Sequence, residues 1–144
     1  MIDASQLVGT YAVLSWKREF ADTGEAVDAL GPVPIGYLSY GADGRVHAIV
    51  VRRDRQPPRN VPPTAEEKIE LFDSMLAYTG TYTLHEDHVV HHIDASWNET
   101  WTGSEQVRFV RLTGATLEIA GAPAPDPYTG RIVVHRIVFR KWAA

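Results

Sequence analysis

Apolar and polar residues alternate along most of this chain, a pattern typical of strands that bury one face of a sheet. Runs of this kind, bounded by glycine, proline or short polar turns, predict strands at 9–16, 35–40, 46–51, 81–84, 89–95, 105–112, 116–120 and 131–142. Short turns at 41–44, 85–87 and 113–115 join neighbouring strands, and strands joined so tightly pair antiparallel. We therefore expect a meander of antiparallel strands.

One stretch has the helical period instead. Thr64 and Glu67 form a capping-box sequence, and apolar residues recur on one side of the following segment, at 65, 69, 72, 75 and 76. Gly80 ends the pattern, since glycine commonly terminates a helix. The sequence predicts one helix over 64–78, whose apolar stripe packs against other apolar residues.

These elements favour an all-β fold. About eight strands can close into an up-and-down antiparallel barrel, which leaves no exposed sheet edge, with the helix packed across one end. A two-sheet sandwich is the alternative. At 144 residues the chain has the size of one domain, and we take 1–144 as a single barrel domain.

The composition excludes several partners and chemistries. A net charge of −4 argues against nucleic-acid binding, because phosphates demand clustered lysine and arginine. The lack of cysteine excludes disulfides and a thiolate nucleophile. We find neither a run of about 18 apolar residues nor a signal peptide, so we expect no membrane partner and a cytoplasmic location. Outward apolar residues on the last strand favour a homodimer surface, unless the helix or the N-terminal turn covers them: Ile132, Val134, Val138 and Trp142.

The stretch 78–101 is the richest in candidate chemistry, with four of the six histidines. Along 89–95 the more apolar face carries Val89, His91 and Ile93, and we expect that face to point inward. His91 would then be a titratable group among aliphatic neighbours. The other face places His92 and Asp94 in water, two residues apart, where they could share an ion, but a third ligand has no obvious source.

The same alternation turns other polar side chains inward. Arg136 and Arg140 most simply face water, which turns His135 inward on the last strand. Tyr82 shares the bulky face of its strand with Leu84, and Tyr40 shares a face with Leu38. Residues 105–112 have two possible orientations, one with Arg108 inward and one with Arg111 inward.

Several motifs in order resemble one family: LVGTY at 7–11, PIGYLSYGADGRV at 34–46, AYTGTYTL at 77–84, VVHHIDASW at 89–97, GSEQVRFVRL at 103–112 and IVFRKW at 137–142. Together they resemble the bacterial lipocalin-like domain family, nearly end to end. The chain departs from lipocalin barrels at Tyr11, where tryptophan is usual, and at Lys141 or Arg140, where a closing arginine packs on that aromatic. The resemblance implies a barrel with an internal cavity and favours Arg108 inward. It implies no particular reaction, because some such barrels carry small apolar molecules and others cyclise or isomerise them.

These inward groups suit acid–base work on a small apolar molecule that carries a carbonyl. Our candidate catalytic residues are His91, His135, Tyr82 and Arg108, and our candidate ligand-binding residues are Tyr40, Leu38, Phe72, Met75, Trp97, Ile93, Ile137 and Phe139. We expect a cyclase or isomerase that uses no cofactor and no metal, since no phosphate loop, dinucleotide fingerprint or Ser-His-Asp order is present. The alternative is a binding or carrier protein without catalysis, in which the buried histidines and tyrosines are hydrogen-bonded core residues.

Overall fold

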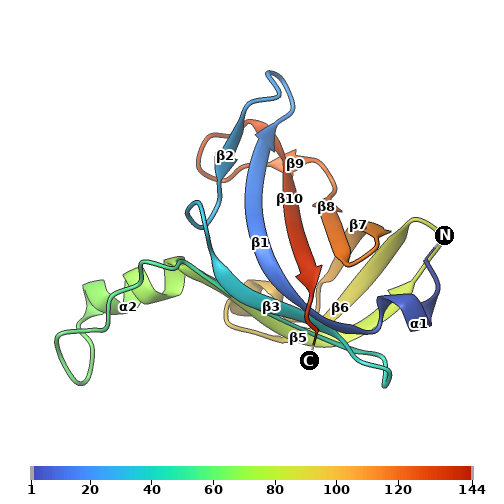
Figure 1. Cartoon of the computed structure of the whole chain (residues 1–144). Helices are drawn as coiled ribbons and strands as arrows, with labels where there is room; N and C mark the ends of the chain where they lie inside the picture. The colour runs from blue at the N-terminus through green and yellow to red at the C-terminus, as the bar shows by residue number, and fades with distance from the viewer. Residues whose placement is uncertain (1, 144) are drawn as a thin grey trace.

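A computed structural model describes residues 2–143, and most of these residues lie in strands (Figure 1). The strands are β1 (Gly9–Phe20), β2 (Ala26–Asp28), β3 (Ile35–Tyr40), β4 (Arg45–Val51), β5 (Met75–Leu84), β6 (His88–Ser96), β7 (Glu105–Thr113), β8 (Thr116–Gly121), β9 (Ala124–Pro125) and β10 (Ile132–Lys141). The helices are α1 (Ala4–Leu7), α2 (Ala65–Asp73) and the short η1 (Glu99–Trp101). No helix in this part of the chain has the length and apolar content needed to cross a membrane.

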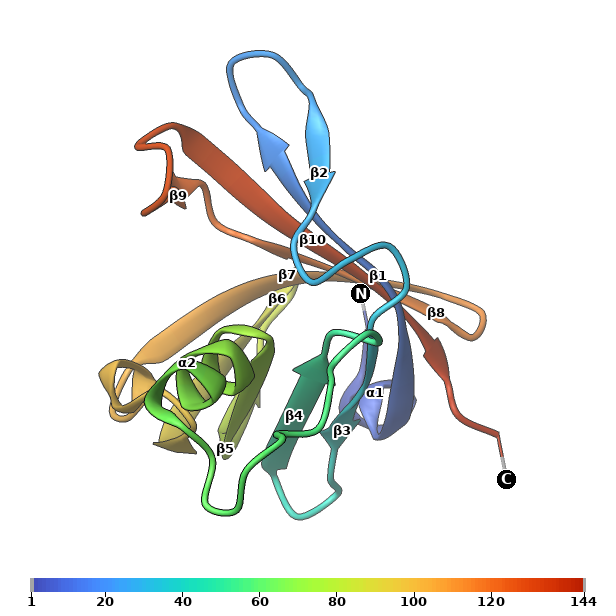
Figure 2. The same cartoon turned by 90° about the vertical axis from the view of Figure 1, so that its left-hand side faces the viewer.

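The strands form one closed antiparallel sheet. Its order is β2-β1-β3-β4-β5-β6-β7-β8-β10-β9, and β1 also pairs with β10, which closes eight of the strands into a ring (Figure 2). The short β2 and β9 only extend the sheet beside β1 and β10. The predicted all-β up-and-down barrel is confirmed, and the sandwich alternative is wrong. Closure removes the free edges that an open sheet of this size would leave.

A bulge in β1 changes which side chains face the interior. Pairing with β10 shifts between Val13 and Ser15, so Leu14 is the extra residue and is 47% exposed. Tyr11 and Val13 are buried below the bulge, and Trp16 faces the interior above it. Simple alternation would have placed Trp16 on the opposite face from Tyr11.

One end of the barrel is solid. Its packed residues are fully buried, and they come from α1 and from four different strands: Leu7, Tyr11, Val46, Val89 and Leu117. The Tyr11 hydroxyl donates to the Leu7 carbonyl oxygen at 2.7 Å, which fixes α1 across this end. Lys141 Nζ lies 5.8 Å from the centre of the Tyr11 ring. Lys141, and not the exposed Arg140, therefore takes the place of the closing cation.

The expected helix over 64–78 is shorter in the structure. It ends at Asp73, and β5 begins at Met75, so two of the five apolar positions assigned to its stripe belong to a strand. No residue of α2 is buried, and Ile69 is 61% exposed. Figure 1 shows α2 projecting from the barrel wall instead of lying across the barrel end. A nine-residue helix with so few apolar residues has little to pack with, and only its last turn reaches the open end of the barrel, through Phe72.

Candidate ligand-binding cavity

The end of the barrel opposite α1 holds a cavity of about 670 Å³. Most of its wall is apolar, with side chains from β3, β4, β5, β8, β10 and the loop before β3: Leu30, Leu38, Val50, Met75, Leu76, Ile119, Ile137 and Phe139. A few polar groups interrupt this wall: Arg18, Asp73, Asn98, Gln106, Arg108, Thr129 and His135. An apolar pocket with a small number of polar groups is the usual character of a small-molecule site.

Four aromatic rings form one side of the cavity. Phe72 lies 5.8 Å from Trp97, Trp97 lies 5.9 Å from Trp101, and Trp101 stacks on Tyr78 at 5.9 Å between ring centres. The Trp97 indole also donates to the Phe72 carbonyl oxygen at 3.2 Å, which ties η1 and its approach to the end of α2. This aromatic wall offers a flat apolar surface to a bound molecule.

His135 is the histidine that lines the cavity. Its Nδ1 accepts a hydrogen bond from Trp16 Nε1 at 2.9 Å. Because an indole only donates, Nδ1 must be unprotonated, and the neutral imidazole carries its proton on Nε2. Within residues 2–143, Nε2 has no hydrogen-bond partner. Burial, together with the charges of Arg108 and Arg18, lowers the pKa of His135 and keeps it neutral. His135 is therefore a neutral N–H donor on the cavity wall.

His91 is inside the barrel but does not line the cavity. The side chain is 1% exposed, and both ring nitrogens bind phenol hydroxyls, Nε2 to Tyr40 at 2.7 Å and Nδ1 to Tyr78 at 2.6 Å. Burial, followed by the charges of Arg108 and His92, lowers the pKa of His91 to about 3. The imidazole is thus a neutral, hydrogen-bonded core group.

The orientation of β7 is clear in the structure. Arg108 and Gln106 face the cavity, and Arg111 lies on the outer wall, where it donates to Glu118 at 2.7 Å. Arg18, which follows the bulge along β1, also reaches the cavity and pairs with Asp126 at 3.3 Å. Two guanidinium groups therefore share one largely apolar enclosure.

The structure brings together eight of the twelve residues expected at the site: His135, Arg108, Leu38, Phe72, Met75, Trp97, Ile137 and Phe139. The other four, His91, Tyr82, Tyr40 and Ile93, do not line the cavity. Tyr82 donates to the Gly41 carbonyl oxygen at 2.7 Å and packs on the Tyr40 ring. Tyr40 and Ile93 are buried without lining the cavity. The expectation for these four needs correction, because facing inward does not distinguish the packed half of a barrel from the hollow half.

The cavity lining also has residues that were not among the expected site residues, and they include Trp16, Arg18, Tyr78, Trp101 and Gln106. Without the bulge at Leu14, alternation places Trp16 on the opposite face from Tyr11. Arg18 lies beyond the predicted end of the first strand. Tyr78 was assigned to the helix. Trp101 lies in the connection that follows β6, and this position after an inward-facing strand is the sequence signal that could have indicated its place at the cavity.

Metal ligands do not gather anywhere in residues 2–143, where no three His, Cys, Asp or Glu side chains are placed to share an ion. His92 binds Thr83 and Glu105, whereas Asp94 pairs with Arg45. The two side chains that the sequence placed on one face thus have separate partners.

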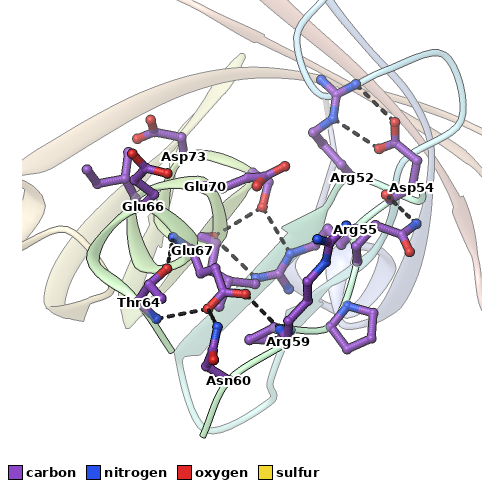
Figure 3. Close-up of a pocket in the computed structure, with 16 residues that line it drawn as sticks. Arg52, Asp54, Arg55, Arg59, Asn60, Thr64, Glu66, Glu67, Glu70 and Asp73 are labelled. Atoms are coloured by element: carbon purple, nitrogen blue, oxygen red, sulfur yellow. Dashed lines mark hydrogen bonds and ion pairs between the residues drawn. The ribbon is translucent and has the colours of Figure 1, made fainter. Parts of the chain in front are cut away.

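A second, larger hollow of about 940 Å³ lies outside the barrel, between the 52–60 loop and α2 (Figure 3). Its walls carry charged and polar side chains that already bind one another. Glu67 accepts from the backbone N–H groups of Thr64 and Arg59, and Arg55 donates to a carbonyl oxygen in the last turn of α2. These bonds fasten the loop to the helix, and we assign this hollow a structural role.

Comparison with known proteins agrees with this architecture. A family model described as a lipocalin-like domain matches residues 8–136. A lipocalin-like protein from Bacteroides uniformis ATCC 8492 is 16% identical, with a TM-score of 0.49 over 94% of this chain and 98% of that one. An uncharacterized protein from Bacteroides eggerthii DSM 20697 is 17% identical, with a TM-score of 0.46 over 94% and 99%. No curated protein matches the chain.

Proposed function

Because this chain belongs to the lipocalin-like domain family, we propose that it binds one small, largely apolar, carbonyl-containing molecule inside its barrel. The observation that carries this proposal is the cavity of about 670 Å³ at one end of the barrel. Sites for small molecules commonly have volumes of about 300–1,000 Å³ and a mostly apolar wall. The His135 N–H and the Gln106 amide are the donors available to a carbonyl oxygen of the ligand.

A blocking substitution tests the proposal. Ala48 is a small side chain on the inner face of β4 and lines the cavity, whereas the next residue, Ile49, lies on the outer face and is 48% exposed. We expect Ala48→Trp to weaken binding of the neutral fluorescent probe N-phenylnaphthylamine by about tenfold or more, because the indole occupies the binding volume. Fluorescence titration measures the change.

Ile49→Trp is the matched control and should bind the probe like the wild type. Equal binding by Ala48→Trp would place the probe outside the barrel and reject the cavity as the site. Failure of the wild type to bind would reject the proposed function itself.

Catalysis is the second candidate function, namely cofactor-free isomerisation or cyclisation of a carbonyl compound. The observation that favours it is the Nε2–H of His135 on the cavity wall, which has no partner among residues 2–143 and lies in the same lining as the positively charged Arg108. Such a donor and a nearby cation stabilise the negative charge that develops on a carbonyl oxygen during enolisation. Asp73 is the carboxylate of the cavity lining and the group available to take the proton.

Exchange of the α-protons of β-tetralone in heavy water, followed by NMR, tests this second candidate. We expect the wild type to accelerate exchange and His135→Phe to lose about tenfold or more of that acceleration, because the N–H donor is gone. His88→Phe, on the outer side of β6, should exchange like the wild type. Equal acceleration by His135→Phe and the wild type would reject the role of His135, and no acceleration by the wild type would leave a binding protein without catalysis.

A further inference from the structure

The cavity is positively charged although the whole chain carries a net charge of −4. Arg18 and Arg108 both line it, and the acid among its lining residues, Asp73, lies at the exposed end of α2. Charges inside an apolar enclosure are costly unless a partner compensates them. Each of these two guanidinium groups therefore needs a compensating partner.

Arg108 has no carboxylate partner within residues 2–143. Its hydrogen bond goes to the carbonyl oxygen of its own neighbour, Val107, at 3.3 Å. Arginines on the outer wall are paired much better. Arg111 reaches Glu118 at 2.7 Å, and Arg136 binds both Glu118 and Glu19 at 3.0 Å. The inward arginine of β7 is thus left without an ion-pair partner in the described residues, on a largely apolar cavity wall.

Arg18 also has a donor to spare. Its Nη1 reaches Asp126 at 3.3 Å, but its Nε is buried and has no hydrogen-bond partner within the described residues. Such an atom is uncommon in a folded protein. The spare donors of Arg18, Arg108 and His135 belong to side chains that line the same cavity.

The positive charge of Arg108 acts on three other polar groups of the interior. Its charge helps to lower the pKa values of His91 and His135, and it opposes the rise in the pKa of Tyr78 that burial causes. A carboxylate bound at Arg108 would offset a charge that all three of these groups experience.

We propose that the cavity takes an apolar monocarboxylic acid, whose carboxylate binds Arg108, with the N–H group of His135 beside it. This inference rests on the proposed binding function and specifies the chemical class of the ligand. Arginine suits the task, since its planar fork binds both oxygens of a carboxylate at once. The aromatic wall and the aliphatic side chains receive the apolar body of the acid.

A matched pair of competitors tests the inference. Naphthylacetic acid and naphthylethanol share one apolar body and differ in the charged group. Each is titrated against bound N-phenylnaphthylamine in the wild type, in Arg108→Gln and in Arg111→Gln. We expect the wild type to bind the acid about tenfold or more tightly than the alcohol. Arg108→Gln should lose this preference but keep the alcohol, and Arg111→Gln, changed on the outer face of the same strand, should retain the preference.

The outcomes separate this inference from the function beneath it. Equal affinities of the wild type for acid and alcohol, or an undiminished preference in Arg108→Gln, would overturn the carboxylate site and leave the binding function standing. Failure of both competitors and of the probe would overturn both. If Arg108→Gln does not fold, Arg108→Lys keeps the positive charge without the planar fork. It should fold and bind the acid more weakly than the wild type, yet still more tightly than the alcohol, and an affinity for the acid equal to that of the wild type would overturn the site.

Discussion

The His91 imidazole lies between two phenol hydroxyls in the packed interior. Tyr40 and Tyr78 reach it from β3 and β5, so three strands meet through this group. A polar side chain buried at this depth is stable only when its hydrogen bonds are made, and here both ring nitrogens have a partner. Alternation along β6 predicted that His91 points inward. It did not predict its partners, because Tyr40 is 51 residues away along the chain.

Burial of the neutral His91 imidazole makes the free energy of unfolding depend on pH. The folded pKa of His91, about 3, lies below its ordinary value of 6.5, so the unfolded chain takes up the proton more readily. The stability that neutral His91 contributes is present in full above about pH 6.5 and is lost as the pH falls toward 3. The loss has a slope of up to about 1.4 kcal/mol per pH unit. His91→Gln should have a smaller slope in urea unfolding measured across this range.

His88→Gln, on the same strand but outside the packed interior, is the control and should show the wild-type slope. A slope in His91→Gln as steep as that of the wild type would contradict this account of His91.

Two helices in this chain begin with the same capping box but have different surroundings. Asp3 and Gln6 cap α1, and Thr64 and Glu67 cap α2, each with both reciprocal hydrogen bonds. α1 buries Leu7 completely against the barrel, whereas α2 buries nothing. The sequence signal identified the start of α2 correctly, but no local signal showed how little of that helix would pack.

The two caps should therefore affect different quantities. Asp3→Ala should lower the free energy of global unfolding, because α1 is part of the packed end. Thr64→Ala should leave global unfolding nearly unchanged and speed hydrogen exchange of the amides of 65–73, since α2 can open by itself. Chemical denaturation and exchange mass spectrometry measure the two effects. An equal loss of global stability in both variants would show that α2 is packed as firmly as α1.

The whole molecule divides into a solid half and a hollow half. Leu117 is fully buried in the solid half, and Ile137, on the strand paired with β8, lines the cavity. The two side chains have similar size and composition. Their difference lies in whether neighbouring atoms surround them on every side.

Truncation should reveal this division. Leu117→Ala should cost about 2–5 kcal/mol of unfolding free energy, because it opens a void in close-packed surroundings. Ile137→Ala should cost about half as much or less, since its side chain already faces open volume. Urea unfolding measures both values. A loss of unfolding free energy in Ile137→Ala as large as that in Leu117→Ala would mean that the hollow half of the barrel is packed as densely as the solid half.

The sequence by itself determined most of the strands, their antiparallel order and the inward direction of His91, His135 and Tyr82, and it favoured a barrel over a sandwich. Those features follow from a period of two residues and from short turns, and both are local properties of the chain. Only the tertiary structure decided which inward residues meet open volume. It also decided where the bulge brings Trp16 inside and that Arg108 has no carboxylate partner in the part of the chain that the structure describes. These features depend on contacts between strands far apart in sequence, and no single stretch of the chain contains both partners.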